Sequence, residues 1–333
     1  MPTTLIDLAS RRDVLFVGGK GGVGKTAVAS ALGMASARAG RPTLVVSTDP
    51  AHNLGHLWQR EVGDSPVQLA RHLRGLEIDP ARTTEQHLSA VRSTLRRLMA
   101  DHLQGEVDKH LELAREAPGT HEAAVLERIA EVVEQREPGE LVVFDTAPSG
   151  HTTRLLALPE MMQAWTEGLL RRQERSARFG AALRGLEGDD AAGAEVIGRG
   201  PRRAPDRRAR RDAEIRSVLD RRQQRFRHLR DVLSDHSRTG FVVVAAAERL
   251  PVLESIELSD HLTRSGMAVA ALVVNKRSPA DAGALLAARR RVEDGYVDQL
   301  ASALPDLPLV QVPLLAGEVL GEAGVGTLLG HLG

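Results

Sequence analysis

The sequence predicts an α/β protein with a doubly wound, mostly parallel sheet and an inserted all-helical subdomain. Short apolar runs of strand length alternate with segments of helical periodicity, a pattern typical of parallel sheets that carry helices on both faces. Polar or glycine-rich residues follow several of these runs, at the strand ends where open α/β sheets bind their ligands. The runs comprise residues 14–17, 43–47, 140–145, 240–246, 268–274 and 309–312, and residues 279–303 form one of the helical patterns between them.

A glycine-rich loop follows the first apolar run. Residues 19–26 read Gly-Lys-Gly-Gly-Val-Gly-Lys-Thr and fit the phosphate-loop pattern G-x-x-x-x-G-K-[ST], in which backbone N–H groups face a phosphate. The small residues of 26–39 continue with helical composition, so the loop joins a strand to a helix. We therefore predict a P-loop NTPase that binds ATP or ADP, with Lys25 on the β- and γ-phosphates and the Thr26 hydroxyl on Mg²⁺. The predicted nucleotide contacts are Gly19, Lys20, Gly21, Gly22, Val23, Gly24, Lys25, Thr26 and Ala27.

Lysine is rare in this chain, which distinguishes the lysines of the phosphate loop. Of 44 lysines and arginines, only those at positions 20, 25, 109 and 276 are lysines. In a chain that otherwise uses arginine, a lysine indicates a place for a compact point charge, where a planar guanidinium would not fit. Lys20 and Lys25 are therefore predicted to neutralise the charge that develops during phosphoryl transfer.

Acidic residues follow two further predicted strands. Asp49 comes just after residues 43–47, and Asp145 ends residues 140–145 in the form of a Walker B segment. We predict that Asp49 orients or deprotonates the attacking water, and that Asp145 holds Mg²⁺ directly or through water. The polar residues 146–152 are predicted to form a switch loop that senses the γ-phosphate.

Asn275 follows the strand predicted at residues 268–274. Its side-chain amide offers both a donor and an acceptor, the pair that an adenine edge requires. An asparagine is equally common in an ordinary turn after a strand. The residues alone therefore leave both interpretations open.

Two insertions with helical periodicity divide the chain. Residues 80–138 have one apolar face around Leu88 and another over residues 125–133. Residues 155–236 begin and end with apolar helical patterns, and residues 185–213 between them are rich in Gly, Asp and Arg, which predicts a mobile loop. The predicted nucleotide domain comprises residues 1–79, 139–154 and 237–333, and the predicted helical subdomain comprises residues 80–138 and 155–236.

Composition narrows the class of protein. Cysteine is absent, which excludes disulfides, Cys-based zinc sites, thiolate capture of arsenic and iron–sulfur ligation. The formal net charge is zero, so the chain has no general attraction for nucleic acid or anionic membranes. No stretch approaches the roughly 18 apolar residues of a membrane span, and the N-terminus lacks a signal-peptide core. We expect a cytoplasmic protein.

The motifs resemble those of the ArsA family, which includes the arsenite-pump ATPases and the eukaryotic guided-entry ATPases that deliver tail-anchored membrane proteins. The phosphate loop carries part of this resemblance. Three further segments carry the rest: residues 49–54 (Asp-Pro-Ala-His-Asn-Leu), residues 145–152 (Asp-Thr-Ala-Pro-Ser-Gly-His-Thr) and residues 313–319 (Pro-Leu-Leu-Ala-Gly-Glu-Val). Together they span most of the chain.

The resemblance implies a role for each matching residue. Asp49 is the catalytic carboxylate and Asp145 supports Mg²⁺. Lys20 is similar to the extra lysine of a deviant Walker A loop, which completes the nucleotide site of a dimer partner. The resemblance also implies that the helical insertions bind a client. The residues that would frame the adenine are Asn275, Pro313 and Leu314.

Three departures from the family pattern bear on function. Ala27 stands where the family has a second hydroxyl residue, which predicts weaker nucleotide binding and not a dead enzyme. The Cys-x-x-Cys clasp of the eukaryotic dimers cannot form in a chain without cysteine, so a dimer must use other surfaces. A single nucleotide module without an internal repeat needs a second subunit to build a two-site assembly.

The expected function is Mg²⁺-dependent ATP hydrolysis that couples dimer closure to binding and delivery of a hydrophobic client, by resemblance a tail-anchored protein. Such a protein would meet membranes only through its client and would have no specific nucleic-acid contacts. One alternative is a partition or positioning ATPase that acts as a spatial regulator. Another is a low-activity regulatory subunit in a heterodimer with a homologous ATPase.

The client groove is the least determined part of this expectation. The apolar residues 161–170 cover about 15 Å of helix, half of the roughly 30 Å of a membrane-spanning client. Two copies across a dimer would supply the full length. Alternatively, the helices bury their apolar stripes against one another, as amphipathic helices usually do.

Overall fold

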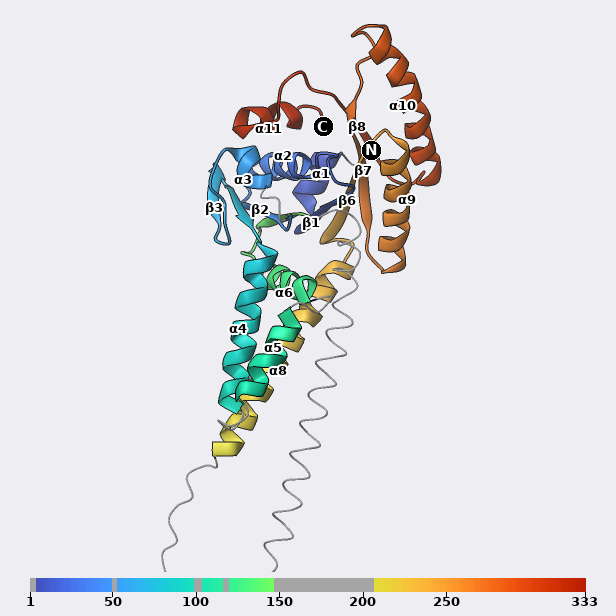
Figure 1. Cartoon of the computed structure of the whole chain (residues 1–333). Helices are drawn as coiled ribbons and strands as arrows, with labels where there is room; N and C mark the ends of the chain where they lie inside the picture. Colours follow the sequence, from blue (N-terminus) through green and yellow to red (C-terminus); the bar gives the residue numbers. More distant parts are fainter. Residues whose placement is uncertain (1–3, 50–52, 99–103, 116–119, 147–206) are drawn as a thin grey trace, which may run out of the picture.

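The computed structural model describes residues 4–49, 53–98, 104–115, 120–146 and 207–333 (Figure 1). Their strands are β1 (Val14–Gly18), β2 (Thr43–Ser47), β3 (Val67–Ala70), β4 (Leu73–Glu77), β5 (Leu141–Asp145), β6 (Thr239–Ala246), β7 (Val269–Arg277) and β8 (Leu309–Pro313). They form one sheet in the order β3-β4-β2-β5-β1-β6-β7-β8. Every neighbouring pair is parallel except β3 and β4. The sheet confirms the predicted fold class.

Two strands at one edge of the sheet were not predicted from the sequence. β4 carries Arg74 and Gly75 in its middle. β3 is short, and most of its side chains are at least partly exposed. An edge strand contacts fewer neighbours than a central one and needs no continuous apolar run, so hydrophobic periodicity gives a weak signal there. The six strands with continuous apolar runs were predicted, and all six form the centre and the far edge of the sheet.

Helices cover both faces of this sheet, which makes it doubly wound. They are α1 (Leu5–Arg11), α2 (Lys25–Arg38), α3 (Asn53–Trp58), α4 (Pro80–Leu98), α5 (Gln104–Arg115), α6 (Thr120–Gln135), α8 (Arg207–Ser234), α9 (Arg249–Arg264), α10 (Ala284–Ala303) and α11 (Gly321–Leu329). On one face α2 packs on the central strands, and α1, α3 and α11 pack around it. On the other face α6, α8, α9 and α10 bury their apolar residues.

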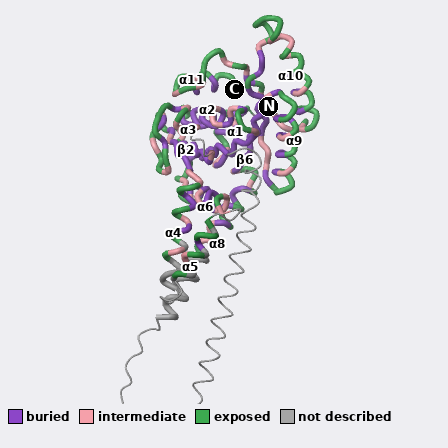
Figure 2. The backbone as a smooth tube through the Cα atoms, viewed as in Figure 1, coloured by how far each residue is buried: buried purple, intermediate pink, exposed green. Residues whose placement is uncertain are grey.

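Alternate residues of β1 supply the two hydrophobic cores. Leu15 and Val17 belong to the core under α2, whereas Phe16 belongs to the core on the opposite face. There the Phe16 ring stacks between the rings of Phe144 and Phe241, with 4.8 Å between centroids on each side. Figure 2 shows the resulting burial in the central elements. A strand buried on both faces fits the continuous apolar run that predicted it.

The helices of the two insertions lie below the sheet in Figure 1. α6 packs against α4 and α8, and α5 packs against α4. The apolar stripe of α6, residues 125–133, is buried in the core shared with the sheet, as expected if such helices cover their own domain. No described helix combines the length and apolar character that crossing a membrane requires.

Parts of the predicted insertions lie outside the described residues. The apolar stretch 161–170 and most of the predicted loop 185–213 are among them. The end of that predicted loop is helical, because α8 begins at Arg207. The division into a nucleotide domain and a helical subdomain stays a prediction.

α2 is built from small residues because it is enclosed on almost every side. Its residues 28–37 are all buried between the sheet and the helices around it. A Cβ atom added to Gly33 would lie 2.6 Å from Cγ2 of Val45 and 3.2 Å from Cδ1 of Leu73. The close approach of helix and sheet therefore depends on the absence of a side chain at position 33.

We predict opposite effects for the same substitution in two helices. Gly33→Ala removes a helix-disfavouring glycine but forces an overlap in the core, so the free energy of unfolding should fall by about 1–3 kcal/mol. Gly295 lies inside α10, is exposed, and has no atom within 4 Å of an added Cβ. Gly295→Ala should therefore raise the free energy of unfolding by about 0.5–1 kcal/mol. Urea unfolding measures both, and stabilisation by Gly33→Ala would contradict the tight packing of α2.

Candidate functional site

The phosphate loop joins the end of β1 to the start of α2 in the middle of the sheet. Gly24 is the N-cap of α2, in the left-handed region with φ of 96°. A Cβ at Gly24 would lie 2.4 Å from Nδ2 of Asn275, and one at Gly19 would lie 2.1 Å from the carbonyl oxygen of Val244. Both positions thus lack room for a side chain. The glycines of the motif let the loop lie close to both β6 and β7.

Lys25 is the first residue of α2 and is buried, with 5% of its surface exposed. Its Nζ donates a hydrogen bond to the carbonyl oxygen of Lys20, 3.1 Å away, so the side chain folds back over the loop. Burial lowers the pKa of Lys25, and the nearby carboxylates of Asp145 and Asp49 oppose that shift. The loop therefore encloses a cation at the position where the motif places phosphate.

Thr26 and Asp145 meet beside that cation. The Thr26 hydroxyl donates a 2.6 Å hydrogen bond to Oδ2 of Asp145, and the Ser47 hydroxyl donates to the same oxygen at 3.4 Å. The other oxygen of Asp145, Oδ1, is buried and has no hydrogen-bond partner in the described part of the chain. Burial raises the pKa of Asp145 to about 6, although the hydrogen bond from Thr26 and the charge of Lys25 lower it.

These two residues fit a magnesium ion. Mg²⁺ prefers hard oxygen ligands and is usually held by one or two protein groups together with waters and substrate phosphates. An unsatisfied carboxylate oxygen beside a hydroxyl provides such ligands. No cluster of three or more His, Cys, Asp or Glu side chains suited to a metal occurs among the described residues.

Asp49 lies just beyond β2, at the carboxyl ends of the strands, where the phosphate loop also lies. Its carboxylate accepts a 3.2 Å hydrogen bond from Nδ2 of Asn53, the first residue of α3, and its backbone N–H donates to the Ser47 hydroxyl at 3.3 Å. Ser47 therefore connects the backbone of Asp49 to the carboxylate of Asp145. Neither Asn53 nor Ser47 was predicted to have a role of its own, although Asn53 belongs to the motif of residues 49–54.

Lys20 contacts α9, which carries none of the site residues described above. Its Nζ forms an ion pair of 3.0 Å with Oε1 of Glu254 on α9, and each side chain is about one third exposed (34% and 35%). Glu254 had no role in the sequence prediction, because nothing in the sequence connects two residues so far apart. The role of Lys20 at the nucleotide of a second subunit stays a prediction.

The residues predicted to frame the adenine lie at the ends of β7 and β8. Asn275 is buried, and its Nδ2 donates to the carbonyl oxygen of Val23 at 2.9 Å. Pro313 ends β8, and the N–H of Leu314 donates to the carbonyl oxygen of Arg277 at 2.8 Å. Asn275 thus contacts the phosphate loop itself, and contacts with an adenine stay a prediction for all three residues.

The predicted switch loop lies outside the described residues from position 147 onward. Its first residue, Thr146, is buried, and its hydroxyl donates to the carbonyl oxygen of Val17 at 3.0 Å. Thr146 therefore lies beside the end of β1, the strand that leads into the phosphate loop.

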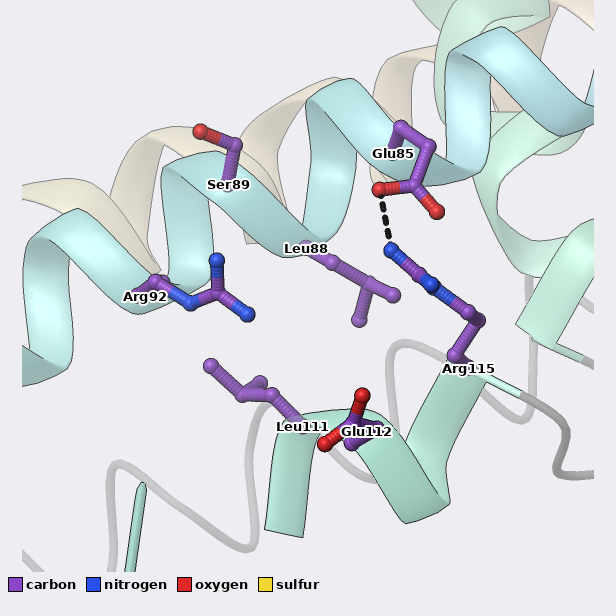
Figure 3. A pocket seen from close by; sticks show the side chains of 7 residues that line it. All are labelled: Glu85, Leu88, Ser89, Arg92, Leu111, Glu112 and Arg115. Atoms are coloured by element: carbon purple, nitrogen blue, oxygen red, sulfur yellow. Dashed lines mark hydrogen bonds and ion pairs between the residues drawn. The ribbon is translucent and has the colours of Figure 1, made fainter. Parts of the chain in front are cut away.

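A small cavity lies between α4 and α5, within the predicted client-binding helices (Figure 3). Its volume is about 40 Å³, enough for only a few water molecules. Leu88 and Leu111 face each other across it, and an ion pair of 2.6 Å between Glu85 and Arg115 borders it. A cavity of this size and polarity cannot hold an apolar helix.

Known proteins that are similar to this chain are ATPases. A family model described as anion-transporting ATPase (ArsA) matches residues 12–332. The chain is 32% identical to an ATPase ASNA1 homolog of Leishmania braziliensis, over 96% of this chain and 92% of that protein. It is 30% identical to the ATPase GET3 of Podospora anserina, over 97% and 91%, and 29% identical to ATPase ASNA1 homolog 1 of Paramecium tetraurelia, over 93% and 89%. The chain therefore belongs to the ArsA family of anion-transporting ATPases and is an ATP hydrolase.

Proposed function

We propose that this ATPase uses Mg²⁺-dependent hydrolysis of ATP to drive closure of a dimer that binds and delivers a hydrophobic client, a tail-anchored membrane protein. One observation supports ATP hydrolysis at this site. Lys25, the pair Thr26 and Asp145, and Asp49 converge at the carboxyl ends of the central strands. The client is proposed from the similarity to proteins named ATPase GET3, which extends over nine tenths of both chains.

Each residue of the site has a defined task in this proposal. The ammonium of Lys25 and the N–H groups of the loop bind the β- and γ-phosphates. Thr26 and Asp145 would hold Mg²⁺, which neutralises charge on the phosphates when it is bound. Asp49 orients the attacking water or accepts its proton, and Asn53 fixes the direction of the Asp49 carboxylate through the hydrogen bond at 3.2 Å.

The surface position of Lys20 supports a role between subunits. An ion pair between two partly exposed side chains contributes roughly 0–1 kcal/mol, so Lys20 can leave Glu254 at little cost. A phosphate on a second subunit offers a stronger, charge-assisted partner. We propose that Lys20 exchanges Glu254 for that phosphate when the dimer closes.

The adenine end of the proposed site lies at β7 and β8. Leu314 is 49% exposed and can cover one face of a base, next to Pro313. Asn275 lies near the end of β7 and supplies an amide at this end. In the proposal these three residues frame the adenine, and Ala27, which lacks a hydroxyl, leaves the phosphate side with one contact fewer.

Substitution of Asp49 tests the catalytic assignment. Asp49→Asn keeps the shape of the side chain but removes its negative charge, so ATP should still bind while turnover falls roughly 100-fold or more. Phosphate release measures turnover, and a fluorescent ATP analogue measures binding. Asp306→Asn, at an exposed carboxylate before β8, is the matched control and should behave as the wild type. Unchanged turnover in Asp49→Asn would refute the role.

The raised pKa of Asp145 predicts how pH affects stability without metal and nucleotide. The folded chain holds this proton more tightly than the unfolded chain, so ionisation of Asp145 destabilises the fold as the pH rises from about 4 to about 6. The penalty is absent below about pH 4 and complete above about pH 6, and a shift of roughly two pKa units corresponds to about 3 kcal/mol.

Asp145→Asn should remove this penalty. In urea unfolding at pH 8 the variant should exceed the wild type by about 1–3 kcal/mol, whereas near pH 4 the two should agree. The same variant should lose the additional stability that Mg²⁺ with ATP gives to the wild type. A variant that is less stable than the wild type at pH 8 would show that the carboxylate is not a strained group.

Size-exclusion chromatography tests the dimer and the client. The Asp49→Asn variant with Mg²⁺ and ATP should elute as a dimer and retain a labelled peptide with about 20 apolar residues, and ADP should release the peptide. A peptide of equal length with two aspartates in the apolar segment is the control. The double variant with Lys20→Met should bind ATP but stay monomeric. Peptide retention that does not depend on nucleotide would contradict the coupling.

A further inference from the structure

The end of β7 departs from regular strand geometry next to the phosphate loop. Val274 pairs with Gln311 and Arg277 pairs with Pro313, so three steps along β7 correspond to two along β8. The extra residue forms a β-bulge. Within it Lys276 has a φ of 58°, in the left-handed region that side chains other than glycine rarely adopt. Such a conformation is strained, and bulges next to active sites commonly redirect a side chain.

The bulge sends two consecutive side chains to the same loop. Nδ2 of Asn275 donates to the carbonyl oxygen of Val23 at 2.9 Å, and Nζ of Lys276 donates to the carbonyl oxygen of Gly22 at 2.8 Å. In a regular strand consecutive side chains point to opposite faces. Without the bulge, only one of these two residues would reach the phosphate loop.

These contacts fix the direction of two peptide groups. In a trans peptide the C=O and the following N–H point in opposite directions, and the described residues contain no cis peptide. Carbonyl groups held toward β7 at Gly22 and Val23 therefore turn the N–H groups of Val23 and Gly24 away from β7. Those N–H groups belong to the part of the motif that faces a phosphate.

The residues that follow the bulge hold it in place. Arg277 is buried, and it donates to Glu293 on α10 and to Gln311 on β8 at 3.0 Å each, besides pairing with Asp294. The N–H and the hydroxyl of Ser278 donate to Glu293 at 2.9 and 2.6 Å. Arg277 and Ser278 thus connect the bulge to α10 and β8, two elements that are independent of the phosphate loop.

We propose that Asn275 and Lys276 are positioning residues, a carbonyl clamp that holds the phosphate loop in the shape that binds the phosphates of ATP. This inference rests on the proposed nucleotide site and adds Lys276 to it. The contact from Lys276 acts through the backbone of the loop and not on the nucleobase, whereas Asn275 also frames the adenine in the proposed function. Loss of the Lys276 contact should therefore weaken binding of ATP and of GTP to the same extent.

The test compares substitutions of Lys276 in the full chain by calorimetric titration with ATP, ADP and GTP in the presence of Mg²⁺. Lys276→Met removes one hydrogen bond to the loop and should weaken binding of each nucleotide about three- to tenfold. Lys276→Arg keeps a donor of similar reach and should recover most of the affinity. Lys109→Met, which removes an exposed lysine on α5, is the matched control and should change nothing.

A glycine variant separates positioning from general stability. Lys276→Gly relieves the left-handed strain, so the thermal midpoint without nucleotide should equal or exceed that of the wild type, while ATP affinity falls as in Lys276→Met. Unchanged ATP affinity in Lys276→Met would overturn the clamp. So would a loss confined to ATP, which would indicate a base contact, or a parallel fall of midpoint and affinity in Lys276→Gly. A wild type that binds no ATP would overturn the nucleotide site and the clamp together.

Discussion

The hydrogen bond from Thr26 to Asp145 joins the first turn of α2 to the end of β5, and the geometry of the site depends on it. It is possible because three central strands are parallel and in register. Asp145 is paired with Val17 of β1 on one side and with Ser47 of β2 on the other. The carboxyl ends of these strands therefore bring together the phosphate loop, the predicted Mg²⁺ ligands and Asp49, where ligands of open α/β sheets collect.

The site holds several groups that do not favour the folded state. The carboxylate of Asp145 is buried with one oxygen unpaired, burial lowers the pKa of Lys25, and Lys276 adopts a left-handed backbone conformation. In the proposed function, a phosphate and a metal ion would relieve two of these conditions: the unpaired oxygen would gain a cation, and Lys25 would gain an anion. Strain and poor solvation concentrated at one place are typical of a binding site that is formed before its ligand arrives.

The helices α4, α5 and α6 lie outside the nucleotide site. The apolar stripe of α6 is buried against the sheet, and the cavity between α4 and α5 has room for only a few waters. These helices thus support the core in the described state. In the proposed function, a larger apolar surface for the client would form on closure or together with a second subunit.

The sequence by itself determined the fold class, the phosphate loop and the two acidic strand ends, because each is encoded in a few adjacent residues with a fixed spacing. Only the tertiary structure showed the edge strands β3 and β4, the pairing of Lys20 with Glu254, and the bulge that turns Asn275 and Lys276 toward the phosphate loop. These features depend on strand register and on contacts between residues far apart in the chain. Local periodicity carries no information about such contacts, and one extra residue in a strand reverses the direction of the side chains that follow it.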